Sequence, residues 1–318
     1  MGYKILIPQD ITKAGKDFLK DKGYKIKVLE DSSMDSICRE VGDCDALLVR
    51  TALYPRKIME AGKQLKVIAR YGAGVDNIDI DAASEYGVQV CNAPIANSNS
   101  VAEHAIALLL ACAKNLKVQD KETRKGNFES RNILKSMEVS GKILGLVGCG
   151  HIGQMVAQKA HYGLHMNVKA YDTYISQSKL PSYIQLVDQI DEIFETCDFI
   201  SLHIPITEDT RDSVNRNLLN KMKPNSVLIN CSRGGVVNEA DLYEVLSRGR
   251  IKAAGIDVFE KEPVSMENPL LQLENVIVSP HNAALTYEAM DQMGIDAAKG
   301  IDEVLSGKTP TWPVNRLR

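Results

Sequence analysis

The sequence lacks any Cys-x-x-Cys pair, although it contains seven cysteines. These cysteines are scattered, a pattern typical of free thiols in a reducing cytoplasm and not of a disulfide framework or a zinc site. Apolar runs long enough to span a membrane are also absent. Basic residues are not in excess, since 38 Lys and Arg stand against 41 Asp and Glu, for a formal net charge of −3. We therefore expect a cytoplasmic protein without a metal, a membrane or a nucleic-acid partner.

The residues that are present predict a globular α/β protein. The chain has 318 residues, more than one typical core needs, so two domains are expected. In residues 1–95, five apolar runs that we interpret as strands alternate with helical patterns, and the alternation resumes at Ile143. It predicts two doubly wound parallel sheets with helices on both faces.

A helical segment separates the two regions. Ser100-Val101-Ala102-Glu103 has the spacing of a capping box, and Ala105–Ala113 is apolar on every side. We expect this helix to lie between domains or in a subunit interface. A long helical pattern at 286–305 is expected to cross back to the first domain. The predicted boundaries are therefore 1–97 with 286–318 for one domain and 98–285 for the other.

A glycine motif follows the expected strand Ile143–Val147. It reads Gly148-Cys149-Gly150-His151-Ile152-Gly153 and leads into a helical pattern. A second strand then ends before Asp172. In a G-x-G-x-x-G turn the glycines permit a tight bend, close approach of a diphosphate and close helix packing, and the helix N-terminus attracts the anion. We interpret the unit as a dinucleotide site; the alternative is a glycine-rich turn in an ordinary α/β protein.

Three residues of complementary chemistry follow other expected strands in the second region. They are Arg233, Glu262 and His281. Because the carboxyl ends of parallel strands meet at one edge, we expect these side chains to point toward one cleft. Each also has a plainer interpretation: a surface turn residue, a solvated loop acid and a buried histidine, respectively.

Beside a dinucleotide, this set suits hydride transfer to a 2-oxo acid. The guanidinium of Arg233 can fork onto a carboxylate and polarise the adjacent carbonyl. The imidazolium of His281 can protonate the oxygen as hydride arrives. Glu262 can orient the ring and favour its charged form. His161 and His165 lie four residues apart on an expected helix, but no third ligand is evident, so no metal site is expected.

Motifs along nearly the whole chain resemble the D-isomer-specific 2-hydroxyacid dehydrogenase family, in particular its D-3-phosphoglycerate dehydrogenase and hydroxypyruvate/glyoxylate reductase members. The most specific segments are RYGAGVDNID (70–79), NSNSVAEHAIALLL (97–110), GLVGCGHIGQ (145–154), NCSRGGVVNE (230–239), GIDVFEKEP (255–263) and SPHNAA (279–284). The resemblance implies a flavodoxin-like substrate domain, a Rossmann NAD-binding domain and a homodimer.

The resemblance also implies roles for individual residues. Arg233, Glu262 and His281 would be the catalytic set. The NAD site would comprise Ala73, Gly148, Gly150, His151, Ile152, Gly153, Asp172, Ile204, Cys231, Ser232, Arg233, Asp257, His281, Ala283 and Ala284. The substrate would be bound by Arg50, Thr51, Ala52, Gly72, Ala73, Gly74, Val75, Arg233 and His281.

Several choices remain within this resemblance. A carboxylate at Asp172 accepts hydrogen bonds from a ribose diol and repels a 2′-phosphate, and residues 173–178 contain no Arg, so NAD(H) is expected. Arg50 and Arg56 are candidates for binding a substrate phosphate. No regulatory domain is expected after Arg318. The alternative function is an NAD(H)-sensing binding protein on the same fold; a relative of S-adenosylhomocysteine hydrolase would leave the Arg, Glu and His loops unexplained.

Overall fold

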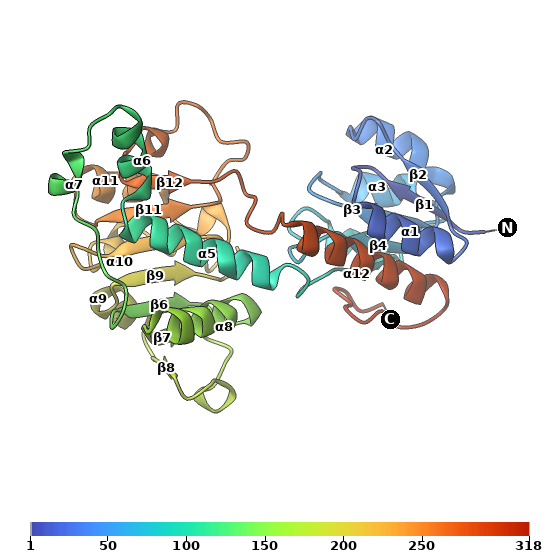
Figure 1. Cartoon of the computed structure of the whole chain (residues 1–318). Helices are drawn as coiled ribbons and strands as arrows, with labels where there is room; N and C mark the ends of the chain where they lie inside the picture. Colours follow the sequence, from blue (N-terminus) through green and yellow to red (C-terminus); the bar gives the residue numbers. More distant parts are fainter. Residues whose placement is uncertain (1, 318) are drawn as a thin grey trace. The chain divides into compact units, whose positions relative to one another are not determined.

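The computed structural model describes residues 2–317, and the chain divides into two compact units. Unit 1 combines the residues up to Ser98 with those from Ala284 onward, and unit 2 is Asn99–Ala283. Each unit is a parallel β-sheet with helices packed on it, as Figure 1 shows. The prediction of two parallel-sheet α/β folds is confirmed.

Unit 1 contains a five-stranded sheet in the order β2-β1-β3-β4-β5, in which every neighbouring pair is parallel. This is the flavodoxin-like order. The strands are β1 (Lys4–Ile7), β2 (Lys25–Val28), β3 (Ala46–Val49), β4 (Val67–Arg70) and β5 (Gln89–Cys91). The helices are α1 (Lys13–Asp21), α2 (Met34–Glu40), α3 (Arg56–Ala61), α4 (Ile80–Glu85) and α12 (Tyr287–Leu305), with a 3-10 turn at Val41–Asp43.

The apolar runs of unit 1 supply two cores, one on each face of the sheet. In β1, Ile5 and Ile7 belong to one core and Leu6 to the other, because successive strand residues point to opposite faces. Helix α12 covers the face of Ile5 and crosses α1 at Gly15 and Gly294. A Cβ added at Gly15 would lie 2.7 Å from the Gly294 carbonyl oxygen, so the close crossing depends on glycine.

Unit 2 contains a seven-stranded parallel sheet in the order β12-β11-β10-β9-β6-β7-β8. Starting from β8, this is the Rossmann order with one strand added at the far edge. The strands are β6 (Ile143–Val147), β7 (Asn167–Tyr171), β8 (Ile184–Leu186), β9 (Phe199–Leu202), β10 (Val227–Asn230), β11 (Ala253–Ile256) and β12 (Val276–Val278).

Short helices connect the strands of unit 2, and a longer one precedes them. The α-helices are α5 (Ser98–Ala113), α6 (Leu116–Arg124), α7 (Ser130–Ile133), α8 (His151–Gln158), α9 (Ile190–Thr196), α10 (Arg216–Leu219) and α11 (Glu239–Ser247). A π-helical turn (Lys159–Gly163) continues α8, and 3-10 turns lie at Gln177–Lys179, Gly234–Val236 and Pro269–Gln272. No helix within residues 2–317 is long and apolar enough to cross a membrane.

Two local expectations were wrong. The edge strand β8 was not expected, because its sequence Ile184-Gln185-Leu186 is interrupted by a polar residue and does not form an apolar run. The proposed capping box does not start α5, which already begins at Ser98. The Glu103 carboxylate instead accepts a hydrogen bond from the Asn99 side chain, one helical turn earlier, at 2.8 Å.

Candidate active site

The glycine turn lies where the strand order of unit 2 reverses, between β6 and β9. Gly148 has φ +91°, and a Cβ there would lie 2.6 Å from the His203 carbonyl oxygen. A Cβ at Gly153 would collide with the Gly148 carbonyl oxygen. These two glycines are therefore required by the turn itself and by the close contact of α8 with it.

Gly150 is different, because neither its backbone nor its surroundings require glycine. Its φ of −71° is open to other residues, and an added Cβ would meet no protein atom within 4 Å. Gly150 is the N-cap of α8, and it makes no side-chain cap hydrogen bond. The N-terminal amides of α8 and the open space over Gly150 fit a diphosphate that approaches the backbone closely.

Asp172 joins this turn to the end of β7. One of its carboxylate oxygens accepts a hydrogen bond from the Cys149 N–H at 2.8 Å, and the other from the Tyr174 N–H at 2.8 Å. The side chain is half-buried. A carboxylate has about four lone-pair sites, so Asp172 is fixed in place and can still accept hydrogen bonds from a ligand diol.

The loop after β10 holds Arg233. The buried Asn230 accepts hydrogen bonds from the Ser232 N–H (3.0 Å) and hydroxyl (2.8 Å), and its amide donates to the Arg233 carbonyl (3.0 Å). A Cβ at the next residue, Gly234, would collide with the Phe259 backbone. The absence of a side chain there lets the Arg233 loop pack directly against the loop after β11, which carries Glu262.

Glu262 and His281 are in direct contact. The Glu262 Oε2 lies 2.7 Å from the His281 Nδ1, and the Oε1 accepts a hydrogen bond from the Phe259 N–H at 3.0 Å. Burial acts to raise the pKa of Glu262, but the hydrogen bonds from His281 and Phe259 and the positive charges of His281 and Arg233 outweigh it and lower that pKa.

The tautomer of His281 follows from this contact. Because an ionised carboxylate can only accept, Nδ1 carries the hydrogen and Nε2 is left for a ligand. The imidazole is about half exposed, with 47% of the side-chain surface accessible. Arg233, Glu262 and His281 thus lie together at the carboxyl edge of the unit 2 sheet.

Asp257 builds the backbone that carries His281. It directly follows β11 and is fully buried. Its carbonyl oxygen accepts from the His281 N–H at 2.7 Å. Its carboxylate accepts from the Ser279 hydroxyl (2.5 Å) and from the N–H groups of Asn282 (3.0 Å) and Ala283 (3.1 Å). His281 has φ +51°, a left-handed conformation that a non-glycine residue keeps only when its surroundings enforce it.

Two histidines near these loops were given no role from the sequence. His203 follows β9, and its Nε2 lies 2.9 Å from the Ser201 hydroxyl. Burial lowers the pKa of His203 to about 4, so its ring is neutral at physiological pH. His104 of α5 lies with its Nε2 2.8 Å from the Ser279 hydroxyl. A signal for His104 was available, since it belongs to the quoted 97–110 segment, but nothing in that segment names its partner.

The remaining residues predicted for the NAD site divide between the units. His151 and Ile152 begin α8, Ile204 follows β9, Cys231 and Ser232 follow β10, and Ala283 ends unit 2. Ala73 and Ala284 belong to unit 1. Cys231 is buried, and burial raises the pKa of its thiol, so it is not a reactive thiolate.

The residues predicted for the substrate include two neighbouring loops of unit 1. Gln9 accepts hydrogen bonds from the N–H groups of Thr51 and Ala52, both at 2.9 Å. The Asn77 amide donates to the carbonyls of Arg50 (2.9 Å) and Ala52 (2.6 Å). These loops follow β3 and β4.

The second of these loops contains Gly72–Val75 and is also held by an amide side chain. Asn92 donates to the Ala73 carbonyl at 2.7 Å, and Gly72 has φ +133°. Together with Asn77, which reaches across to the Arg50 loop, Asn92 fixes the backbone at the carboxyl edge of the unit 1 sheet.

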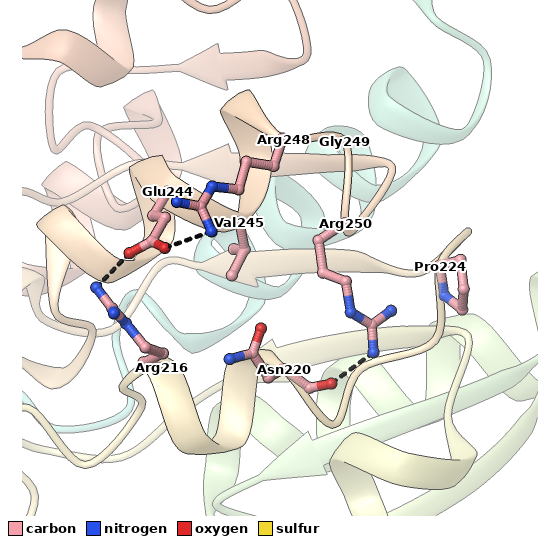
Figure 2. Close-up of a pocket in the computed structure, with 8 residues that line it drawn as sticks. All are labelled: Arg216, Asn220, Pro224, Glu244, Val245, Arg248, Gly249 and Arg250. Carbon is pink, nitrogen blue, oxygen red and sulfur yellow. Dashed lines mark hydrogen bonds and ion pairs between the residues drawn. The ribbon is translucent and has the colours of Figure 1, made fainter.

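Unit 2 also has a hollow of about 410 Å³ away from this edge, shown in Figure 2. Its arginines are already occupied: Arg248 donates to Glu244 at 2.8 Å, Arg216 also pairs with Glu244, and Arg250 donates to the Asn220 carbonyl at 2.5 Å. The hollow lies beside the amino ends of β10 and β11, opposite the edge that carries Arg233. Within residues 2–317, no group of three or more His, Cys, Asp or Glu side chains could hold a metal ion.

Comparison with known proteins relates the sequence of this chain to one family. The sequence model of the D-isomer specific 2-hydroxyacid dehydrogenase NAD binding domain matches residues 106–283. The chain is 40% identical to a D-3-phosphoglycerate dehydrogenase of Methanocaldococcus jannaschii, over 98% of this chain and 59% of that protein. It is 40% identical to a hydroxypyruvate reductase of Thermotoga maritima, over 94% of this chain and 97% of that protein.

A solved structure extends the similarity to three dimensions. The NADPH-dependent glyoxylate/hydroxypyruvate reductase of Sinorhizobium meliloti has a TM-score of 0.88 and 26% identity, covering 98% of this chain and 97% of that one. The chain spans under two thirds of the length of the D-3-phosphoglycerate dehydrogenases of Archaeoglobus fulgidus and Methanocaldococcus jannaschii.

Proposed function

The chain belongs to the D-isomer specific 2-hydroxyacid dehydrogenase family, and we propose that it is an NAD-dependent oxidoreductase that interconverts a D-2-hydroxy acid and its 2-oxo acid. The observation that carries the proposal is the 2.7 Å contact between Glu262 and His281, with Arg233 in the adjacent loop. A fixed acid–base pair, a guanidinium and a glycine turn at one sheet edge supply the groups that this reaction needs.

Each of the three side chains has a separate task in this reaction. In the direction of reduction, His281 donates the proton on Nε2 to the carbonyl oxygen of the substrate, and in oxidation the same nitrogen removes it. Glu262 holds the ring by Nδ1 and balances its positive charge. Arg233 binds the substrate carboxylate and draws electron density from the neighbouring carbonyl.

The dinucleotide is proposed to bind across the glycine turn. The space over Gly150 and the N-terminal amides of α8 would hold its diphosphate, and Asp172 would accept hydrogen bonds from the ribose diol. When bound, the nicotinamide supplies or accepts the hydride. A 2′-phosphate would meet the Asp172 carboxylate, and residues 173–178 offer no Arg to bind it, which supports NAD(H) over NADP(H).

For the substrate, we favour a small acid of the 3-phosphoglycerate or hydroxypyruvate/glyoxylate type. Unit 1 is then the substrate domain, with the backbone of 72–75 for the carboxylate and residues 50–52 for the remainder of the molecule. Arg50 donates to the Asp10 carbonyl at 2.9 Å and lies 5.6 Å from the Tyr71 ring centroid. A substrate phosphate would have to compete with these contacts, so hydroxypyruvate or glyoxylate is the simpler fit.

Two further proposals concern the protein in the cell. The absence of any disulfide among the seven cysteines supports a reducing, cytoplasmic location. A homodimer is proposed from the family resemblance, and the apolar helix α5 is a candidate for part of its interface. Light scattering after gel filtration would measure the mass; a monomer at micromolar concentration would remove the dimer from the proposal.

The proposed activity is tested by the oxidation of NADH with glyoxylate, hydroxypyruvate, 3-phosphohydroxypyruvate and a branched 2-oxo acid. We expect turnover with at least one of the first three, and a tenfold or greater preference for NADH over NADPH. Arg233→Ala should lose most of the turnover, while Arg248→Ala, an exposed arginine at the opposite edge, should keep it. A preference for NADPH would contradict the role given to Asp172.

The alternative is an NAD(H)-sensing binding protein on the same fold. It is distinguished by binding without turnover: NADH would bind with micromolar affinity, and none of the four acids would be reduced. Such a result would overturn the enzyme and favour the sensor. The contact between His281 and Glu262 favours the enzyme, because a sensor does not need an imidazole whose Nε2 is left for a substrate.

A further inference from the structure

We infer that His104 is a positioning residue for His281, holding through Ser279 and Asp257 the loop that carries the catalytic imidazole. The inference rests on the proposed function and adds a residue from another element to it. His104 belongs to α5, and its Nε2 lies 2.8 Å from the Ser279 hydroxyl and 3.6 Å from the Asp257 carboxylate. All four residues belong to unit 2.

Helix α5 reaches this loop because it packs on β11 at a glycine. A Cβ at Gly255 would lie 2.9 Å from the Leu108 side chain, so a larger residue would push the helix away. Two residues further along the chain, Asp257 points to the same face, since strand side chains repeat every second residue. One helical turn before Leu108, His104 lies on the same face of α5. The close contact therefore sets His104 over Asp257.

The directions of the hydrogen bonds follow from the groups themselves. The carboxylate of Asp257 can only accept, so the Ser279 hydroxyl donates its one hydrogen there, at 2.5 Å. The oxygen of Ser279 must then accept from His104, which places a hydrogen on the Nε2 of that ring. His104 thus adds a second hydrogen bond that holds the Ser279 oxygen in the orientation that donates to Asp257, and a side chain without a donor would leave the hydroxyl held by Asp257 alone.

The loop needs such a support because His281 is held in an unfavourable conformation. Its left-handed backbone is strained and persists only while neighbouring contacts enforce it. Four of those contacts end on Asp257, which accepts from the His281 N–H, the Ser279 hydroxyl and the N–H groups of Asn282 and Ala283. The His281 N–H also donates to the Ser279 carbonyl at 3.1 Å. Loosening Ser279 lets the imidazole move relative to Glu262, and displacements near 1 Å cost up to about 100-fold in rate.

The test compares two substitutions of similar size. Gln can place an amide N–H where Nε2 lies in His104, whereas Leu has no donor. With NADH and the best 2-oxo acid, we expect His104→Leu to lower kcat about tenfold, with the KM for NADH within about twofold of wild type. His104→Gln should recover kcat to within about threefold. Equal kcat values for the two variants, or a loss confined to KM, would overturn the inference.

A double-substitution cycle tests whether the effect passes through Ser279. Ser279→Ala and the double variant His104→Leu/Ser279→Ala should have similar kcat, because the second change removes a bond that the first has already broken. If the two substitutions lower kcat independently, so that their fold-losses multiply in the double variant, the inference that His104 acts through Ser279 is overturned. His161→Leu, a histidine elsewhere in unit 2, is the control and should leave kcat unchanged.

One readout does not depend on turnover, so failure of the proposed activity can be told apart from failure of this inference. If wild type reduces none of the acids, the proposed function fails, and the positioning role is judged by amide hydrogen exchange without cofactor. Faster exchange at Asn282 and Ala283 in His104→Leu, restored in His104→Gln, supports it. Exchange equal to wild type in both variants overturns it.

Discussion

The two units use the same sheet architecture but hold their loops with different chemical groups. In unit 1, the loops after β3 and β4 are fixed by the neutral amides of Gln9, Asn77 and Asn92. In unit 2, the loops after β6 and β12 are fixed by the carboxylates of Asp172 and Asp257, and only the loop after β10 is held by a neutral amide among those described above, that of Asn230. An amide keeps its hydrogen bonds at any ordinary pH, whereas a carboxylate loses acceptor strength on protonation.

This difference corresponds to the tasks proposed for the loops. A loop whose backbone binds a substrate needs only a fixed shape, and neutral amides supply it. A loop that presents a proton donor also needs negative charge nearby, which Glu262 provides beside His281. The comparison predicts that acid affects unit 2 before unit 1, and each of the following experiments tests part of it.

The largest effect is expected from replacing a supporting carboxylate of unit 2 by a neutral amide of the kind that supports the loops of unit 1. Asp257→Asn leaves one oxygen to accept from the Ser279 hydroxyl and two N–H groups, and places an amide donor against them. With buried donors left unsatisfied, the free energy of unfolding should fall by about 4 kcal/mol, and turnover should be lost. Urea titration measures the former; an Asn variant as stable as wild type would show that the charge is not needed.

The next effect concerns His203, which is half-buried beside the glycine turn. Its folded-state pKa is lowered from 6.5 to about 4, so the unfolded chain binds a proton that the folded chain does not. The free energy of unfolding is therefore not reduced by this group above pH 6.5, and it falls by about 3 kcal/mol as the pH is lowered toward 4. His203→Gln should reduce the dependence of the free energy of unfolding on pH between 6.5 and 4, as measured by urea titration at several pH values. An unchanged slope would place the acid sensitivity elsewhere.

A smaller effect on stability is expected from Glu262→Gln. Because the folded-state pKa of Glu262 is lowered, its stabilisation is present above its ordinary pKa and is lost as pH falls through the folded value. The side chain is 37% exposed, so screening limits the effect to less than about 1 kcal/mol. The difference in Tm from wild type should vanish near pH 3. A difference independent of pH would mean that packing, not charge, is responsible.

The smallest effect is expected in unit 1. Gln9→Glu keeps an oxygen that accepts from Thr51 and Ala52, so it should match wild type at pH 7 and lose about 1 kcal/mol on acidification. Gln9→Leu should show the same loss at both pH values. Thermal unfolding at pH 7 and pH 3 compares them, because a carboxylate that accepts two N–H groups is protonated only below its ordinary pKa. A Gln9→Glu variant whose thermal stability does not change with pH would contradict the proposed contrast between amide and carboxylate supports.

Much of the fold could be predicted from the sequence because it depends on local patterns. Apolar runs alternate with helical patterns, which indicated both parallel sheets, and the glycine spacing indicated the turn between β6 and α8. Arg233, Glu262 and His281 were identified because each follows an apolar strand, although their roles remain predictions. The first residue of α5 was misjudged because two competing side chains, Asn99 and Ser100, lie next to each other.

The supporting residues could not be predicted, because their partners are distant in sequence. His104 contacts Ser279, 175 positions away, and this contact depends on how closely α5 approaches Gly255. Asp257 was expected near the cofactor, but its hold on the 279–283 loop depends on three-dimensional turns that no spacing reveals. Gln9 and Asn77 likewise act on a loop that is more than 20 residues from either of them.

The most direct measurement is single-turnover oxidation of bound NADH by hydroxypyruvate or glyoxylate in wild type and His281→Gln, with NADH affinity followed by fluorescence. Loss of the proton donor should slow the step by about 10²–10⁴-fold while the dissociation constant for NADH stays within about threefold. A His281→Gln protein that turns over at the wild-type rate would contradict the assignment of His281 as the acid–base group.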